Sequence, residues 1–339
     1  MEKLIYRDDT PLDRHDPKTT LITEPYEYLQ KLPGNNRAIR IVFIKAFNDL
    51  YFGIDNDGLI NGLNELVDML HDCSLIIDDV EDSSEYRRGA LAAHLKFGVP
   101  STVNCVNYMY FVAIDKASKL APLYTSDLHE QELITLRVNK IITDEMLNLH
   151  HGQGVDIYWR DNKSDLPRLP TEEEYLEMVM DKTGGLLRIM VKVLEAFKPS
   201  KSTKHVALTS LIGIIYQLRD DYFNLTSDKY SHMKGVVGED LIEGKFSFPI
   251  LHSLRFSMTS PLYELLYNRS VEKRKSSESH HLIAESIKFM TNESNSLEYT
   301  NNKLKECLNM ARKLIETDPT VHNSDSTYIL QILHQLSDT

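Results

Sequence analysis

Carboxylates gather in the short segment DDVED, which begins at Asp78, and two adjacent arginines, Arg87 and Arg88, follow it closely. Asp78 and Asp82 are four residues apart, so on a helix they lie on one face, with Asp79 beside them. Carboxylates this close together repel one another and lose hydration unless a cation lies between them. Hard oxygen ligands at this spacing suit Mg²⁺, and arginine side chains grip phosphate oxygens. The segment therefore predicts a magnesium site that binds a diphosphate.

A second apolar segment, LIGIIYQLRDDYFNL, also ends in carboxylates. On a helix, one face of it carries the polar residues Gln217, Asp220, Asp221 and Asn224. A single Asp-Asp pair on a helix is usually a surface feature. Two such pairs on apolar helices can instead face each other across a cavity and hold several Mg²⁺ ions on one diphosphate. We therefore expect the two acidic segments to share one site.

Two lysine-containing segments fit the same site. DKTGGLL places Lys182 and Thr183 before a glycine pair, which allows a ligand to approach the backbone closely. EDLIEGKFSFP places Lys245 in another helical region. Taken alone, each lysine is better interpreted as a solvated surface residue. The two acidic helices favour phosphate binding instead.

Composition limits the possible functions. The chain has 339 residues, of which 42% are hydrophobic and 26% charged, enough for one large or two smaller globular domains. A net charge of −12 argues against a nucleic-acid partner. The widely separated Cys73, Cys105 and Cys307 indicate neither a disulfide framework nor a zinc site. No apolar run resembles a signal peptide or a transmembrane segment, so we expect a soluble, cytoplasmic protein.

Hydrophobic periodicity predicts an all-α fold, because strand-like alternation is nearly absent. Thr171 and Glu174 have capping-box spacing and mark the start of one helix. The predicted helices cover roughly residues 24–32, 37–51, 57–82, 89–96, 101–121, 126–154, 171–197, 203–225, 239–256, 260–269, 279–290, 294–317 and 325–337.

These segments, with PYEYLQKLPG, GVPSTVNCVNYMYF, HHGQGVDIYWRD and SLEYT, resemble trans-prenyltransferases of the isoprenyl diphosphate synthase family. The resemblance is greatest to fungal and animal geranylgeranyl diphosphate synthases and leaves out the N-terminus and residues 270–290. It implies an isoprenoid synthase fold, in which a single trans-prenyltransferase domain, residues 23–339, surrounds a deep central cavity. Residues 1–22 would be a variable N-terminal segment, and the protein a homodimer or higher homo-oligomer.

The resemblance also assigns roles to individual residues. The two aspartate-rich motifs and a catalytic lysine would be Asp78, Asp79, Asp82, Asp220, Asp221 and Lys182. The Mg²⁺ ligands among them would be Asp78, Asp82 and Asp220. Binding of the allylic diphosphate falls to Arg87, Lys182, Thr183, Gln217, Lys234 and Lys245. Binding of isopentenyl diphosphate falls to Arg37, Arg40, His71 and Arg88.

Three segments depart from the family pattern. GNNRAIR, which contains Arg37, has two extra residues and an Arg in place of the Lys of G-K-x-x-R. Asn224 replaces the third aspartate of the second motif, as it also does in the fungal and animal group. KGVVGED, which contains Lys234, is one residue longer than the family spacing. From periodicity alone, His71 could equally be a packed helix histidine.

The length of the product would depend on the depth of the cavity below Asp78. Cys73 and Ser74 lie about 6–7.5 Å along the helix from this residue, and both are small, so a growing chain can pass. In the fungal and animal enzymes, large residues farther down form the floor. The corresponding positions here are Tyr110, Phe111 and His150, although aromatic residues on an apolar helix need no role beyond core packing.

The implied activity is Mg²⁺-dependent condensation of isopentenyl diphosphate with an allylic diphosphate to give geranylgeranyl diphosphate. The starter would be farnesyl diphosphate, with dimethylallyl and geranyl diphosphate as alternatives, and the product would supply isoprenoid synthesis and protein prenylation. A farnesyl diphosphate synthase or a non-catalytic regulatory subunit are the alternative functions. A terpene cyclase would need no site for a second diphosphate. The cluster of Arg40, His71 and Arg88 and the second Asp-Asp pair favour chain elongation over cyclisation.

Overall fold

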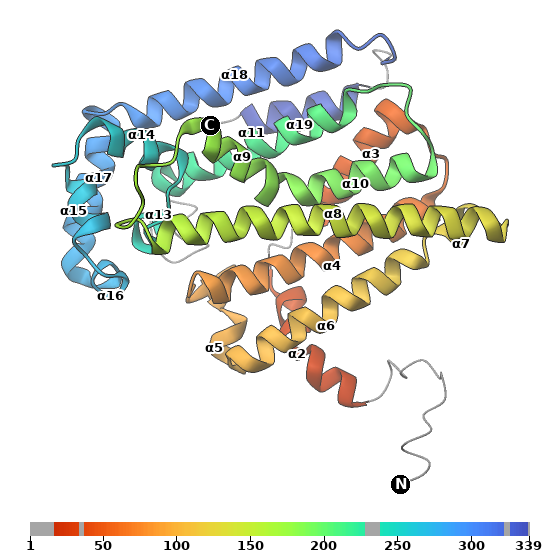
Figure 1. Ribbon diagram of the computed structural model, residues 1–339, viewed down its shortest axis with the longest axis horizontal. Coiled ribbons are helices and arrows are strands. Elements are labelled where there is room, and N and C mark those ends of the chain that lie inside the picture. Colours follow the sequence, from red (N-terminus) through yellow and green to blue (C-terminus); the bar gives the residue numbers. More distant parts are fainter. Residues whose placement is uncertain (1–16, 34–36, 228–237, 322–325, 338–339) are drawn as a thin grey trace.

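The computed structural model describes residues 17–33, 37–227, 238–321 and 326–337, and these residues form α-helices with one short β-hairpin (Figure 1). This confirms the all-α prediction. The N-terminal elements are α2 (Pro17–Lys31), α3 (Arg37–Phe47), the π-helix η1 (Asn48–Phe52), α4 (Asp57–Glu81), β1 (Tyr86–Arg87), β2 (Ala90–Leu91), α5 (Ala93–Phe97), α6 (Val99–Ser118) and α7 (Ala121–Tyr124). Within the described ranges, no helix has both the length and the apolarity needed to cross a bilayer.

The remaining elements complete the walls of a central cavity and a C-terminal layer. They are α8 (Leu128–Asp161), α9 (Glu172–Lys182), α10 (Gly184–Phe197), α11 (His205–Thr226), α13 (Glu239–Glu243), α14 (Phe248–Phe256), α15 (Pro261–Tyr267), α16 (Val271–Lys275), η2 (Ser277–Ser279), α17 (His280–Asn292), α18 (Ser296–Glu316) and α19 (Thr327–Ser337). In Figure 1, α8 crosses the middle of the molecule, α4 and α6 lie below it, and α15, α16 and α17 gather at one end.

Helix α4 carries the first acidic segment. The side chain of Asn56 accepts a hydrogen bond from the Leu59 N–H at 2.9 Å and caps the first turn. Apolar residues at helical spacing pack α4 against α3, α6 and α10. The helix ends at Glu81, one residue before the predicted end, so Asp78 and Asp82 lie at its C-terminus.

Close packing between helices fixes the segment that contains Lys182. A Cβ on Gly152 of α8 would lie 2.5 Å from the Lys182 amide nitrogen, so only glycine permits this contact with the end of α9. A Cβ on Gly213 of α11 would likewise lie 3.0 Å from the Gly184 Cα. The junction between α9 and α10 is therefore held tightly between α8 and α11.

The predicted helix over residues 171–197 is divided into α9 and α10 at Thr183. Its start is confirmed: the Glu174 N–H donates to the Thr171 hydroxyl at 3.1 Å, and the Thr171 N–H donates to the Glu174 carboxylate at 2.7 Å. The prediction over 239–256 is similarly divided into α13 and α14. The left-handed conformation of Gly244, with φ of 81°, ends α13.

The prediction of a helix over residues 89–96 is wrong in its first half. Strands β1 and β2 pair antiparallel there, and Arg88 and Gly89 form the turn with φ of 55° and 77°. A two-residue hairpin turn with both φ values positive matches the twist of the strands, and this local geometry overrides helix propensity. Helix α2 also begins earlier than predicted, at Pro17, and α8 continues beyond residue 154 to Asp161.

Buried apolar residues form a main core and a smaller cluster. The main core includes residues from α3, α4, α8, α10, α11, α14 and the C-terminal helices. The smaller cluster lies where α2, α4 and α6 meet, and it contains both Cys73 and Cys105. Cys73, although adjacent to Ser74 in sequence, therefore belongs to this cluster.

Candidate active site

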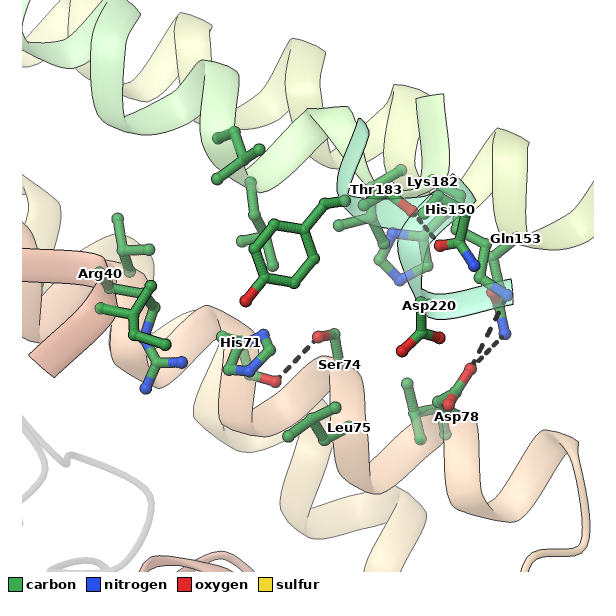
Figure 2. Close-up of a pocket in the computed structure, with 18 of the residues that line it drawn as sticks. Arg40, His71, Ser74, Leu75, Asp78, His150, Gln153, Lys182, Thr183 and Asp220 are labelled. Atoms are coloured by element: carbon green, nitrogen blue, oxygen red, sulfur yellow. Dashed lines mark hydrogen bonds and ion pairs between the residues drawn. The ribbon is translucent and has the colours of Figure 1, made fainter. Parts of the chain in front are cut away.

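A cavity of about 500 Å³ lies among helices α3, α4, α8, α10 and α11. Its acidic lining residues are Asp78, Glu81, Asp82, Asp220 and Glu243, and its basic ones are Arg40, Arg87, Arg88, Lys182 and Lys245. Apolar side chains such as Leu149, Leu187 and Met190 line other parts of it. Figure 2 shows Asp78 of α4 and Asp220 of α11 directed into the same space. The structure thus brings both acidic segments to one cavity.

Asp78 contacts side chains from two other helices. One of its carboxylate oxygens accepts a hydrogen bond from the Gln153 amide at 3.1 Å (Figure 2). The same amide donates to Glu81 at 2.7 Å. The ammonium group of Lys182 lies 4.0 Å from that oxygen of Asp78. Gln153 of α8 therefore links two carboxylates on α4 that would otherwise only repel each other.

A terminal nitrogen of Arg87 lies 3.5 Å from the other carboxylate oxygen of Asp78, but the main partner of Arg87 is Asp79. Asp79 is 1% exposed and is not among the residues that line the cavity. It accepts two hydrogen bonds from the Arg87 Nε atom, at 2.9 and 3.1 Å, and a third from the end of the same guanidinium group. Asp82 lines the cavity and forms an ion pair with Arg160 of α8. Asp79 thus holds Arg87 in place.

Two buried lysines provide positive charge in the cavity. Lys182 lies 2.6 Å from a carboxylate oxygen of Asp156, and Lys245 lies 3.9 Å from one of Asp240. Although burial opposes its charged form, Asp156 raises the pKa of Lys182. Burial likewise opposes the charge of Lys245, yet Asp240 and Asp156 raise the pKa of Lys245 well above its usual value. Both lysines are therefore cationic at neutral pH.

The polar face of α11 is divided between two environments. Gln217 and Asp220 line the cavity, and Gln217 accepts a hydrogen bond from the Thr183 hydroxyl at 2.7 Å. Asp221 is buried behind them and accepts hydrogen bonds from the Gln217 amide at 2.8 Å and the Phe248 N–H at 2.7 Å. Burial, together with the charge of Asp240, raises the pKa of Asp221 to about 7. The side chain of Asn224 accepts a hydrogen bond from the Asp240 N–H at 3.2 Å, on the same side as Asp221.

The residues expected to bind isopentenyl diphosphate lie along one wall. Arg40 and His71 line the cavity beside Ser74 (Figure 2). Arg88 also lines it, from the hairpin turn. Arg40 forms an ion pair with Asp68 on α4. Burial, together with the positive charges of Arg40 and Arg88, lowers the pKa of His71 to about 3. His71 is therefore a neutral hydrogen-bonding group at pH 7.

The side chains of two other expected binding residues, Arg37 and Lys234, lie outside the described part of the structure. Arg37 is the first residue of α3, and its side chain lies outside the described part of the structure. Lys234 lies outside the described residues altogether.

The structure places the residues expected to control product length in different environments. Ser74 and His150 line the cavity, whereas Cys73 is fully buried between α4 and α6. Tyr110 packs edge-on against the ring of His150, with ring centroids 5.8 Å apart, and so lies one layer behind the wall. Phe111 is 72% exposed, because it lies on the face of α6 that points away from α4. In this chain, Ser74 and His150 are the members of the set that face the cavity.

Three polar residues of α8 that were not predicted from the sequence contact the expected site residues. Gln153, Asp156 and Arg160 are spaced at i, i+3 and i+7, and they contact Asp78, Lys182 and Asp82 in turn. That spacing was visible in the sequence. The prediction ended this helix at residue 154, which removed two of the three residues from the face.

The donor set of the cavity suits Mg²⁺ only together with a substrate. Among the described residues, no three His, Cys, Asp or Glu side chains come close enough to enclose a metal ion alone. Mg²⁺ usually keeps some waters and binds one or two carboxylates plus substrate phosphates, which fits Asp78, Asp82 and Asp220 on the walls of a cavity. Burial and the charge of Asp78 raise the pKa of Asp82 to about 6. A cation between these carboxylates would relieve that repulsion.

The sequence of the chain matches a family model and several curated proteins. The family model described as polyprenyl synthetase matches residues 19–285. A geranylgeranyl pyrophosphate synthase of Fusarium fujikuroi is 43% identical over 303 residues, which are 89% of this chain and 65% of that protein. One of Eremothecium gossypii is 43% identical over 240 residues, 70% of each protein. The chain therefore spans about two thirds of the length of these relatives.

A solved structure has the same fold. The crystal structure of geranylgeranyl pyrophosphate synthetase from Pyrococcus horikoshii superposes with a TM-score of 0.74 over 95% of this chain and 91% of that one, at 18% identity. The two proteins therefore share the fold, although fewer than a fifth of the aligned residues are identical. Because the family model matches most of the chain and relatives at over 40% identity align along it, the chain belongs to the polyprenyl synthetase family.

Proposed function

We propose that the protein is a Mg²⁺-dependent geranylgeranyl diphosphate synthase that joins isopentenyl diphosphate to an allylic diphosphate and accepts farnesyl diphosphate as the starter. One observation carries the proposal: carboxylates from α4 and α11 face a single cavity that also contains Lys182 and Lys245. The names of the relatives support the same activity. The product would serve isoprenoid synthesis, including the supply for protein prenylation, and the enzyme would work as a cytoplasmic homodimer.

The chain's own residues would divide substrate binding between two sets of basic groups. Lys182, Lys245 and Arg87 would bind the allylic diphosphate, while Arg40, His71 and Arg88 would bind isopentenyl diphosphate. Mg²⁺ held by Asp78, Asp82 and Asp220 would neutralise the charge that develops on the leaving diphosphate.

The reaction balances without a dedicated base. The allylic C–O bond breaks, the double bond of isopentenyl diphosphate attacks the allylic carbon, and loss of a proton restores the alkene. The departing diphosphate accepts that proton. The apolar lining, including Leu149, Leu187 and Met190, would exclude water from the allylic cation.

The test is an assay of the purified protein with Mg²⁺, isopentenyl diphosphate and labelled farnesyl diphosphate, followed by chromatography of the dephosphorylated products. We expect geranylgeraniol as the main dephosphorylated product. Addition of EDTA, which removes Mg²⁺, should abolish its formation. A product that stops at farnesol when dimethylallyl diphosphate is the starter would identify a farnesyl diphosphate synthase. No turnover at any Mg²⁺ concentration would favour the regulatory-subunit alternative. Light scattering of the same sample tests the homodimer.

A further inference from the structure

The short helix α16 contacts two turns that flank the cavity. It lies in the part of the chain, residues 270–290, that the sequence resemblance left out, and its own residues do not line the cavity. Two adjacent basic residues, Arg274 and Lys275, make the contacts. One reaches the turn before Lys245 and the other reaches the turn after α4.

Arg274 is 2% exposed, and its guanidinium group donates only to main-chain oxygens in the hydrogen bonds described here. Its Nε lies 2.8 Å from the Ile242 carbonyl, and a terminal nitrogen lies 3.0 Å from that of Glu243. The other terminal nitrogen lies 2.8 Å from the Arg269 carbonyl. Ile242 and Glu243 are the last two residues of α13, where carbonyl groups lack helical partners and a cation is favourable.

The turn that Arg274 holds leads directly to Lys245. Gly244 ends α13 in a left-handed conformation, and the N–H groups of Gly244 and Lys245 both donate to the Asp240 carbonyl at 2.9 Å. A Cβ on Gly244 would lie 2.7 Å from a terminal nitrogen of Arg274, so the guanidinium packs directly against this turn. Movement of Arg274 would therefore shift the backbone that carries Lys245.

Lys275 makes the second contact. Its ammonium group donates to the Ser83 carbonyl at 3.0 Å and lies 3.9 Å from a carboxylate oxygen of Glu85. Ser83 directly follows Asp82, and its φ of 52° turns the chain toward the hairpin. Helix α16 thus connects the end of the first acidic helix with the turn before Lys245.

We propose that Arg274 is a positioning residue: it holds the last turn of α13 so that Lys245 points into the cavity and binds the substrate diphosphate. Lys275 assists by fixing the turn after Asp82 relative to the same helix. This inference rests on the proposed function, because it takes Lys245 as a diphosphate-binding residue. A shift of about 1 Å in such a group is enough to cost up to about a hundredfold in rate.

The experiment measures binding of inorganic pyrophosphate with Mg²⁺ by calorimetry, together with the KM for the allylic substrate and kcat. The variants are Arg274→Met, Arg274→Lys, Lys245→Met and Arg274→Met with Lys245→Met. Lys273→Met, an exposed neighbour on the same helix, is the matched control. We expect Arg274→Met to weaken pyrophosphate binding about tenfold or more, Arg274→Lys to restore part of it, and the control to match wild type.

The double variant separates positioning from general loss of structure. If Arg274 acts through Lys245, replacing Arg274 has little further effect once Lys245 is Met, so the two losses do not add. Additive losses would overturn the inference, as would unchanged binding in Arg274→Met. If Arg274→Met does not fold, the same cycle is run with Arg274→Lys. Unchanged binding in Lys245→Met would instead count against the proposed function.

Discussion

Arg87 and Asp79 form a buried ion pair in which the arginine Nε contacts both carboxylate oxygens, at 2.9 and 3.1 Å. The side chains are 13% and 2% exposed. The neighbouring Arg88 occupies the hairpin turn with positive φ and also lines the cavity. The two adjacent arginines therefore differ in structural role. Both line the cavity, but Arg87 also neutralises a buried carboxylate, whereas Arg88 forms part of the hairpin turn.

Replacing Arg87 with Ala should lower the free energy of unfolding by about 3–5 kcal/mol, because it leaves the Asp79 carboxylate buried without its partner. Arg88→Ala should lower it much less. Urea unfolding of the two variants measures the difference. We also expect Arg87→Ala to raise the KM for the allylic substrate and Arg88→Ala to raise that for isopentenyl diphosphate. Equal unfolding free energies would contradict the role assigned to the ion pair.

Replacing Asp78 with Ala should remove nearly all turnover and leave the thermal midpoint close to that of wild type. Removing Asp78 relieves its repulsion of Asp82, and this gain offsets the loss of its contacts with Gln153, Lys182 and Arg87 in the metal-free protein. Thermal unfolding with and without Mg²⁺ and pyrophosphate gives a second readout. Wild type should be stabilised by the pair of ligands and Asp78→Ala should not. Near-normal turnover in the variant would remove Asp78 from the metal site.

His71 should make the protein less stable in acid. Its pKa is about 3 in the folded protein, against an ordinary value of 6.5. Between these values, the unfolded chain binds a proton that the folded protein excludes, so stability is present above pH 6.5 and falls as the pH drops toward 3. His71→Gln should lose less stability than wild type over this range. Urea unfolding at several pH values gives the free energy of unfolding of both proteins. If it falls equally with pH in wild type and His71→Gln, then His71 does not cause the loss of stability in acid.

Ser74 and Cys73 should respond differently to the same substitution. Ser74 faces the cavity, so Ser74→Phe should shorten the product toward fifteen carbons. Cys73 is packed in the cluster between α2, α4 and α6, where Phe should instead lower stability by about 1–3 kcal/mol through overpacking. Tyr110→Ala should lengthen the product, because it removes the ring that packs behind His150. Chromatography of dephosphorylated products measures product length, and urea unfolding measures the stability of Cys73→Phe. An unchanged product from Ser74→Phe would refute the assignment.

The sequence by itself determined the helical architecture and the identity of most charged groups at the site. Apolar periodicity predicted α4 to within one residue, and the capping box predicted the start of α9. The spacing of Asp78 and Asp82 requires only that the segment be helical. These features are local, because they depend on residues within one or two helical turns of each other.

Only the tertiary structure decided which member of each polar pair faces the cavity. Asp78 and Asp79, Cys73 and Ser74, and Asp220 and Asp221 are neighbours in sequence, and a helix turns by about 100° between them. One member of each pair therefore lines the cavity, and the side chain of the other contacts the elements packed behind the helix. For Asp79 and Asp221, those partners are Arg87 and the main chain at Phe248, which come from other elements. Such contacts depend on how whole helices pack, and local spacing carries no information about them.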